Sequence, residues 1–169
     1  MQKIIRNFLE INSLNDLAEK KKPIEIEKIN LKLIADFQLN KFLYKQIGKK
    51  FNWTDRLLWS DQDWIKYINR SNLFTYILIV SDNIAGFFEL IYHEDKSEIE
   101  IVYLGLLPEY TGKKLGGYLL SEAIKISWKF KINRIWVHTC SLDHKNALNN
   151  YLSRGMKIFD TKIIKKNTA

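Results

Sequence analysis

Three acidic residues could act together as a base in this sequence. Glu98 and Glu100 are two positions apart on a predicted strand, so their carboxylates face the same side. If the preceding turn is centred near residues 94–95, Glu89 lies opposite Glu100 on the neighbouring strand. Two carboxylates at that spacing raise the pKa of one of them toward neutrality, which suits a group that accepts a proton. The alternative is an ordinary solvated edge of a sheet.

A glycine-containing loop follows the same strand. Residues 99–106 are nearly all apolar, which predicts a strand buried on both faces. Gly112, Gly116 and Gly117 then let the main chain approach a ligand closely, just before a predicted amphipathic helix. Free N–H groups at the start of a helix attract anions, so the segment predicts a phosphate cradle. It has neither the P-loop pattern nor the dinucleotide-binding glycine pattern.

A second predicted strand carries Trp136, His138 and Cys140 on one face. A Cys/His pair suggests a covalent intermediate, but side chains two positions apart on a strand run parallel and do not converge. We therefore expect these residues to pack in the sheet. Three histidines and one cysteine without ligand spacing predict no metal site.

The segment around the glycines resembles motif A of the GNAT superfamily, the acyl-CoA-dependent N-acyltransferases. Residues 104–110 read LGLLPEY, as in the family, and Gly112 and Gly116 fit the signature that follows. Two positions depart from it, because Thr111 replaces a Gln or Arg and Lys114 replaces a glycine.

A second block, at residues 134–159, supports the resemblance. The family has a strand there, then the pattern A-x-x-x-Y-x-x-x-G-[FM] and a final strand. Ala147, Tyr151, Gly155 and Met156 fit this pattern in register. His144 stands where the family commonly has an asparagine.

The resemblance implies an α+β GNAT fold. Its central sheet is mixed and mostly antiparallel, has helices on both faces, and is splayed between the motif A strand and the next strand. It also implies acetyl-CoA as co-substrate and no metal. The main chain of Leu104 and Leu106 would bind pantetheine. The cofactor loop would comprise Thr111, Gly112, Lys113, Lys114, Leu115, Gly116 and Gly117, and His144 would touch CoA or simply be exposed. If this site needs a positive φ, a lysine at position 114 costs about 1–2 kcal/mol. If its backbone is already helical, the ammonium of Lys114 could add a phosphate contact.

The implied reaction is direct transfer of an acetyl group to an amine. Glu100 lies in a segment that resembles the strand where some members carry a general base, so it is our first candidate and Glu89 the second. Tyr151 occupies the position of a tyrosine near the CoA sulfur and is the candidate general acid, with a core aromatic as the alternative. A CoA-binding regulatory module without turnover is the alternative function.

The acceptor site is expected between the first two helices and the sheet. Trp53 and Arg56 lie in an aromatic and polar segment and could frame an acceptor that carries a carboxylate. They could equally form a helix-packing cluster. The expected acceptor is a small molecule or an N-terminal amine, and a homodimer is left open.

Composition bounds the remaining possibilities. A length of 169 residues with 46% apolar content fits a single domain over residues 1–169, with residues 1–22 as an N-terminal extension. No apolar stretch reaches 18 residues and no signal peptide is evident, so we expect a cytoplasmic protein without a membrane partner. The lone Cys140 fits a reducing compartment. The net charge of +8 has no nucleic-acid-binding motif beside it, so we do not expect a nucleic-acid partner.

Hydrophobic periodicity and turn residues predict the elements that position these groups. Strands are expected at residues 6–11, 23–29, 74–80, 84–92, 98–106, 134–140 and 156–163. Helices are expected at residues 14–20, 31–48, 60–70, 115–130 and 144–154, with Asp143 as N-cap of the last one.

Overall fold

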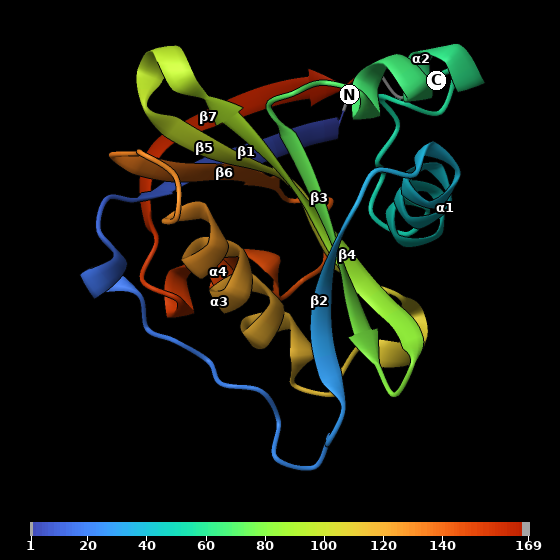
Figure 1. The fold of residues 1–169 in the computed structure, drawn as a ribbon. Helices are drawn as coiled ribbons and strands as arrows, with labels where there is room; N and C mark the ends of the chain where they lie inside the picture. The colour runs from blue at the N-terminus through green and yellow to red at the C-terminus, as the bar shows by residue number, and fades with distance from the viewer. Residues whose placement is uncertain (1, 167–169) are drawn as a thin grey trace.

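The computed structural model describes residues 2–166 and arranges them around one twisted sheet (Figure 1). The strands are β1 (Gln2–Ile11), β2 (Ile29–Ile34), β3 (Leu73–Val80), β4 (Asn83–His93), β5 (Glu98–Leu106), β6 (Arg134–Cys140) and β7 (Lys157–Lys166). The α-helices are α1 (Phe37–Gly48), α2 (Asp61–Ile68), α3 (Leu115–Ser127) and α4 (Ala147–Ser153). Short 3₁₀ turns occupy Leu14–Asp16, Glu94–Lys96 and Pro108–Tyr110.

The strand order is β2-β3-β4-β5-β6-β1-β7. Within residues 2–166 every paired neighbour is antiparallel except β5 and β6, which run parallel. The N-terminal strand β1 therefore lies between β6 and β7, and the expected extra strand is an integral part of the sheet.

Helices cover both faces of the sheet, with α1 and α2 on one side and α3 and α4 on the other (Figure 1). Leu43 and Ile47 of α1 pack against Ile77 and Phe87 of the sheet. On the opposite face a larger core joins α3 to five of the strands, through Leu9, Leu78, Leu90, Ile101, Leu119, Ala123 and Val137. Alternation of side chains along each strand separates these two cores.

The parallel pair β5–β6 separates partway along its length. Its ladder joins Glu98 to Arg134 and ends where Ile101 meets Val137. Strand β5 continues to Leu106 beside β4, and β6 continues to Cys140 beside β1. The predicted splay between these strands is therefore confirmed, and it opens the sheet at its centre.

Most predicted elements are confirmed, but three regions differ. The strand expected at residues 23–29 is β2 at Ile29–Ile34, and its ladder with β3 pairs Leu31 with Leu78. Leu31 and Ala35 have helical spacing, but Ile29, Leu31 and Leu33 also alternate as in a strand, and pairing with β3 selects the strand. The helix α1 begins only after Asp36, whose carboxylate accepts the N–H of Leu39.

The other two differences are shortened helices. Only Leu14–Asp16 of the expected helix at residues 14–20 is helical, as one 3₁₀ turn. Helix α4 begins at Ala147 with Asn146 as N-cap, so the expected start at His144 with Asp143 as cap was wrong. By contrast, the predicted cap of α2 is a full capping box between Ser60 and Asp63.

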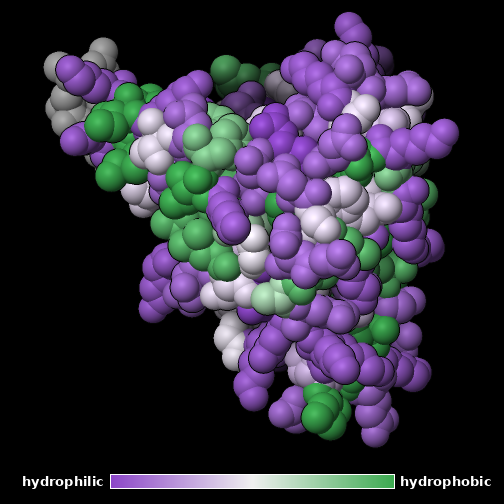
Figure 2. Space-filling view, turned by 90° about the vertical axis from the view of Figure 1, so that its left-hand side faces the viewer, coloured by the Kyte–Doolittle hydropathy of each residue, from purple (hydrophilic) through white to green (hydrophobic). Residues whose placement is uncertain are grey.

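None of the helices in the described residues is long and apolar enough to cross a membrane. The face shown in Figure 2 is mostly hydrophilic, with apolar side chains interspersed among polar ones.

Candidate active site

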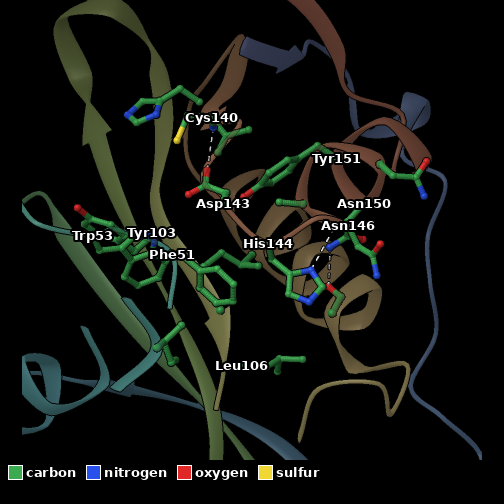
Figure 3. A pocket seen from close by; sticks show the side chains of 18 of the residues that line it. Phe51, Trp53, Tyr103, Leu106, Cys140, Asp143, His144, Asn146, Asn150 and Tyr151 are labelled. Carbon is green, nitrogen blue, oxygen red and sulfur yellow. Dashed lines mark hydrogen bonds between the residues drawn. The ribbon is translucent and has the colours of Figure 1, made fainter. Parts of the chain in front are cut away.

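A cavity of about 990 Å³ opens where β5 and β6 separate. Its walls come from β5, β6, the loop before α3, helix α4 and the segment between α1 and α2 (Figure 3). Most of the residues singled out from the sequence line it, namely Trp53, Glu100, Leu104, Leu106, Thr111, Gly112, Lys114, Leu115, Gly116, Gly117, His144 and Tyr151. Glu89, Arg56 and Lys113 are not among the lining residues.

The loop before α3 forms one end of the cavity. Gly112 has φ +77° and Lys114 has φ +60°, so both adopt the left-handed conformation. The lysine therefore occupies a backbone conformation that favours glycine, at a cost of about 1–2 kcal/mol. In the described structure the N–H groups of residues 112–117 have no hydrogen-bond partner outside the helix itself. Free N–H groups of this kind suit an anion, and anion binding at this end stays a prediction.

Gly116 leaves room beside these N–H groups. A Cβ added there would meet only the amide nitrogen of Asn150, at 3.8 Å, which is an ordinary contact. The Asn150 amide also donates to the carbonyl oxygen of Gly116, at 3.1 Å. The packing of the fold therefore does not itself require glycine at this position.

Two basic residues that the motif comparison did not single out lie at the same end. Lys20 and Arg154 line the cavity, and both contact the position that a Cβ of Gly117 would occupy. The backbone N–H of Lys20 donates to Ser121 Oγ of α3, at 2.8 Å, which fixes this residue beside the helix. Positive side chains near helix N–H groups strengthen an anion site. Proximity of residues 20 and 154 arises only in the folded chain.

The side chains of Lys113 and Thr111 both contact neighbouring residues of the same loop. Lys113 Nζ lies 5.2 Å from the ring centroid of Tyr110, away from the cavity. The Thr111 hydroxyl donates to the carbonyl oxygen of Pro108, at 2.7 Å, and so stabilises the turn.

Glu100 and Tyr151 lie in the same cavity but on different elements. One carboxylate oxygen of Glu100 lies 3.1 Å from Nε2 of His93. Tyr151 is buried in α4, and its hydroxyl points toward Asp143 (Figure 3). Burial, with the nearby charge of Asp143, raises the pKa of Tyr151 above that of an ordinary phenol, which is itself protonated at neutral pH. The site thus contains a carboxylate and a phenolic proton donor.

Asp143 has its own structural role. Its Oδ2 accepts hydrogen bonds from Thr139 Oγ1, at 2.6 Å, and from the N–H of Cys140, at 2.8 Å. These bonds hold the turn after β6 and explain why Asp143 does not cap α4.

Glu89 does not lie opposite Glu100, as we had expected. The ladder pairs Glu89 with Tyr103 and Glu100 with Ile91. The turn after β4 joins His93 to Glu98 and is therefore centred one residue later than we had expected, and an irregularity after Glu89 shifts the register by one more residue. Glu89 is fully buried and binds Arg56, whose Nη1 lies 3.0 and 3.1 Å from its two oxygens. Tyr67 and Asn40 donate to the same carboxylate, at 2.9 and 3.2 Å.

Arg56 is therefore a core residue and not part of the cavity wall. Only 3% of it is exposed, and its guanidinium lies 4.1–5.6 Å from five aromatic ring centroids, those of Tyr44, Trp59, Trp64, Tyr67 and Tyr103. The helix-packing alternative is the one that the structure supports for this residue.

Trp53 does line the cavity, beside two residues that the sequence did not single out. Its ring lies 4.4 Å from that of Tyr103, centroid to centroid. The carboxylate of Asp55 accepts hydrogen bonds from the hydroxyls of Tyr103, at 2.6 Å, and Tyr44, at 2.8 Å. Asp55 also lines the cavity, so the wall near α1 presents an acid between aromatic rings.

His138, Cys140 and His144 complete the walls. His138 and Cys140 line the cavity, so they are not merely packed within the sheet as we had expected. Desolvation, with the positive charge of Arg6, lowers the pKa of His138, while burial raises the pKa of the Cys140 thiol. The His144 ring meets Phe51 across the opening, at a centroid distance of 5.5 Å (Figure 3).

The sequence matches the profile of the acetyltransferase (GNAT) family over residues 35–156. This match spans more than half of the chain, and the chain belongs to that family. No match was found among curated proteins.

Solved structures share the fold at low sequence identity. A GCN5-related N-acetyltransferase from Kribbella flavida has a TM-score of 0.67 at 12% identity, covering 94% of this chain and 56% of its own. One from Sphaerobacter thermophilus has a TM-score of 0.67 at 13% identity, covering 96% of this chain and 51% of its own. An aminoglycoside acetyltransferase from an uncultured soil metagenomic sample, in complex with trehalose, has a TM-score of 0.60 at 16% identity and covers 75% of this chain and 86% of its own.

This chain thus spans only about half the length of the Kribbella and Sphaerobacter proteins. At these identities the likeness concerns the fold, and the predicted α+β GNAT fold is confirmed. Within residues 2–166, no three His, Cys, Asp or Glu side chains converge in a way that could hold a metal ion.

Proposed function

We propose that this protein is an N-acetyltransferase that moves an acetyl group from acetyl-CoA directly to an amine. One observation carries the proposal: the gap between β5 and β6, the loop before α3, Glu100 and Tyr151 all border a single cavity. An acyl-CoA and an amine could therefore meet there without a covalent enzyme intermediate.

The residues at the loop end fit a CoA ligand. Unpaired N–H groups, open space at Gly112 and Gly116, and the side chains of Lys20 and Arg154 suit the phosphates. Beyond Ile101, β5 has no ladder partner on its β6 side, which leaves main-chain groups near Leu104 and Leu106 for pantetheine. When bound, acetyl-CoA supplies the activated acyl group and a thiolate leaving group.

The protein's own side chains would accept the proton of the amine and donate a proton or hydrogen bond to the leaving sulfur. An alkylammonium near pKa 10.4 must lose a proton, which costs about 4–5 kcal/mol at neutral pH. Glu100 is the proposed acceptor of that proton, directly or through water. The Tyr151 hydroxyl, whose pKa is raised by burial, is the proposed donor of a hydrogen bond or proton to sulfur.

Thiol release measured with a panel of amines tests the proposal. The wild-type protein should consume acetyl-CoA only when an acceptor is present, and Glu100→Gln should lower that rate. Glu94→Gln is the matched control, because Glu94 is exposed on the turn after β4 and lies outside the cavity.

The alternative outcomes separate the two functional hypotheses. CoA binding by calorimetry with no thiol release from any amine would favour the regulatory module. Absence of CoA binding would refute both. Mass spectrometry of a co-purified ligand provides an independent check.

A further inference from the structure

Arg6 of β1 lines the cavity without a partner of opposite charge. In residues 2–166 its guanidinium forms no ion pair and no hydrogen bond, and its Nε atom is buried without an acceptor. A buried donor without a partner is costly, so such a group in a cavity wall favours an anionic ligand. The other arginine considered for this role, Arg56, is already neutralised by Glu89.

Strand alternation places the side chain of Arg6 on the face of the sheet opposite α3 and the loop before it. Arg6 pairs with Cys140, and Phe8, two residues along β1, pairs with His138 and contacts its ring at 5.7 Å. Leu9, by contrast, belongs to the core against α3. Because side chains alternate along a strand, Arg6 and Phe8 point to the face opposite α3, where the acceptor is expected.

The charged groups of this part of the cavity have both signs. Glu100 and Asp55 line it from β5 and from the segment after α1, while Asp143 and His138 line it from the β6 side. The carboxylates of Glu100 and Asp55 suit an ammonium group. Arg6 suits a carboxylate, because its planar fork matches one in two parallel hydrogen bonds.

We propose that Arg6 binds a carboxylate of the acceptor, and that the acceptor is an extended amino acid whose reacting amine lies several methylenes from that carboxylate. This inference rests on the proposed function and specifies its acceptor class.

The register also sets the spacing between the two groups. Glu100 is level with Trp136 on β6, whereas Arg6 is level with Cys140, four residues further along. Four residues of strand span about 13 Å, and two strand spacings add about 10 Å across the sheet. Side chains stand roughly perpendicular to a sheet, so we infer that the ends of the Arg6 and Glu100 side chains keep much of that separation. An α-amino acid such as glycine is too short to reach both groups.

The first test compares 6-aminohexanoate with hexylamine, which has the same chain without the carboxylate. The wild-type protein should use 6-aminohexanoate with a kcat/KM roughly ten- to a hundredfold higher, since a hydrogen-bonded charge contributes on that order. Glycine should be a poor acceptor. Arg6→Gln should remove the preference, so that kcat/KM with 6-aminohexanoate falls to about the value that the same variant shows with hexylamine.

Two further variants control for loss of charge and of folding. Lys162→Gln removes a positive charge from the neighbouring position on β7, outside the cavity, and should keep the preference. Arg6→Lys keeps the charge without the planar fork and should restore part of it. Equal use of both amines by the wild-type protein, with thiol release intact, would overturn the role of Arg6 and leave the proposed function standing.

A binding experiment decides the point without turnover. The imidazole resonances of His138, assigned with His138→Gln, should shift saturably with 6-aminohexanoate in the wild-type protein and in Lys162→Gln. They should not shift in Arg6→Gln, provided that its circular dichroism matches the wild-type spectrum. A shift that persists in Arg6→Gln, or no shift in the wild-type protein, would overturn the inference even if no acceptor is acetylated.

Discussion

Replacing Glu89 with glutamine should unfold this protein at much lower temperature or denaturant concentration. Glu89 is 0% exposed and Arg56 is 3% exposed, so the ion pair between them is removed from solvent. Glu89→Gln keeps the shape of the side chain but leaves the guanidinium without a counter-charge. It also turns an NH₂ group toward donors such as Tyr67 and Asn40.

The magnitude follows from the burial of the pair. Removing one partner of a buried ion pair costs about 3–5 kcal/mol. For a chain of this length, 1 kcal/mol corresponds to about 2–4 °C, so the midpoint should fall by about 6–20 °C. Lys28→Gln is the matched control, since Lys28 and Asp82 are 75% and 84% exposed and their ion pair should contribute nothing measurable.

Urea unfolding followed by tryptophan fluorescence measures the difference in free energy, and calorimetry measures the midpoint. Glu89 was our second candidate for the base, and the same variant tests that role. An unchanged midpoint combined with a large loss of kcat would show that Glu89 acts in catalysis and that the structural reasoning is wrong.

Four further predictions follow from the cavity and its surroundings. Gly116→Ala should keep the thermal midpoint, because a Cβ meets only Asn150 at 3.8 Å, whereas Gly116→Glu should weaken CoA binding in calorimetry; equal losses of stability and affinity would show that this glycine serves the fold. Lys114→Gly should raise the free energy of unfolding by about 1 kcal/mol, because φ is +60° there, and a decrease in urea unfolding would contradict this. Glu100→Gln and Tyr151→Phe should each lower kcat by about 10²–10⁴-fold without a large change in CoA affinity. The loss in Glu100→Gln should fall mainly on the acidic limb of the pH profile of kcat. Burial raises the pKa of Tyr44 from 10.0 to about 12, so the unfolded chain loses this proton at lower pH than the folded protein does. The stability that neutral Tyr44 contributes is therefore present below pH 10 and lost as the pH rises toward 12. Urea unfolding at alkaline pH measures this loss.

The sequence alone determined the elements whose signals are local. The capping box of Ser60 and Asp63, the apolar run of β5 and the glycine-containing loop each depend on residues close in sequence. Two motif blocks in the right order also predicted the fold class and the separation of β5 from β6. The loop end of the cavity was predictable for the same reason, because consecutive residues supply most of its backbone donors.

Tertiary structure alone decided which side chains share the cavity. The turn between β4 and β5 pairs His93 with Glu98, one residue later than the sequence suggested, so Glu100 meets Ile91 instead of Glu89. Since side chains alternate along strands, a change of one residue in register alters which groups meet. The insertion of β1 between β6 and β7 likewise brought Arg6 beside Cys140, from 134 positions away in the sequence. Neither the register of a ladder nor the neighbours of a distant strand leaves a local pattern, because pairing is set by the competition of whole strands for the same sheet edge.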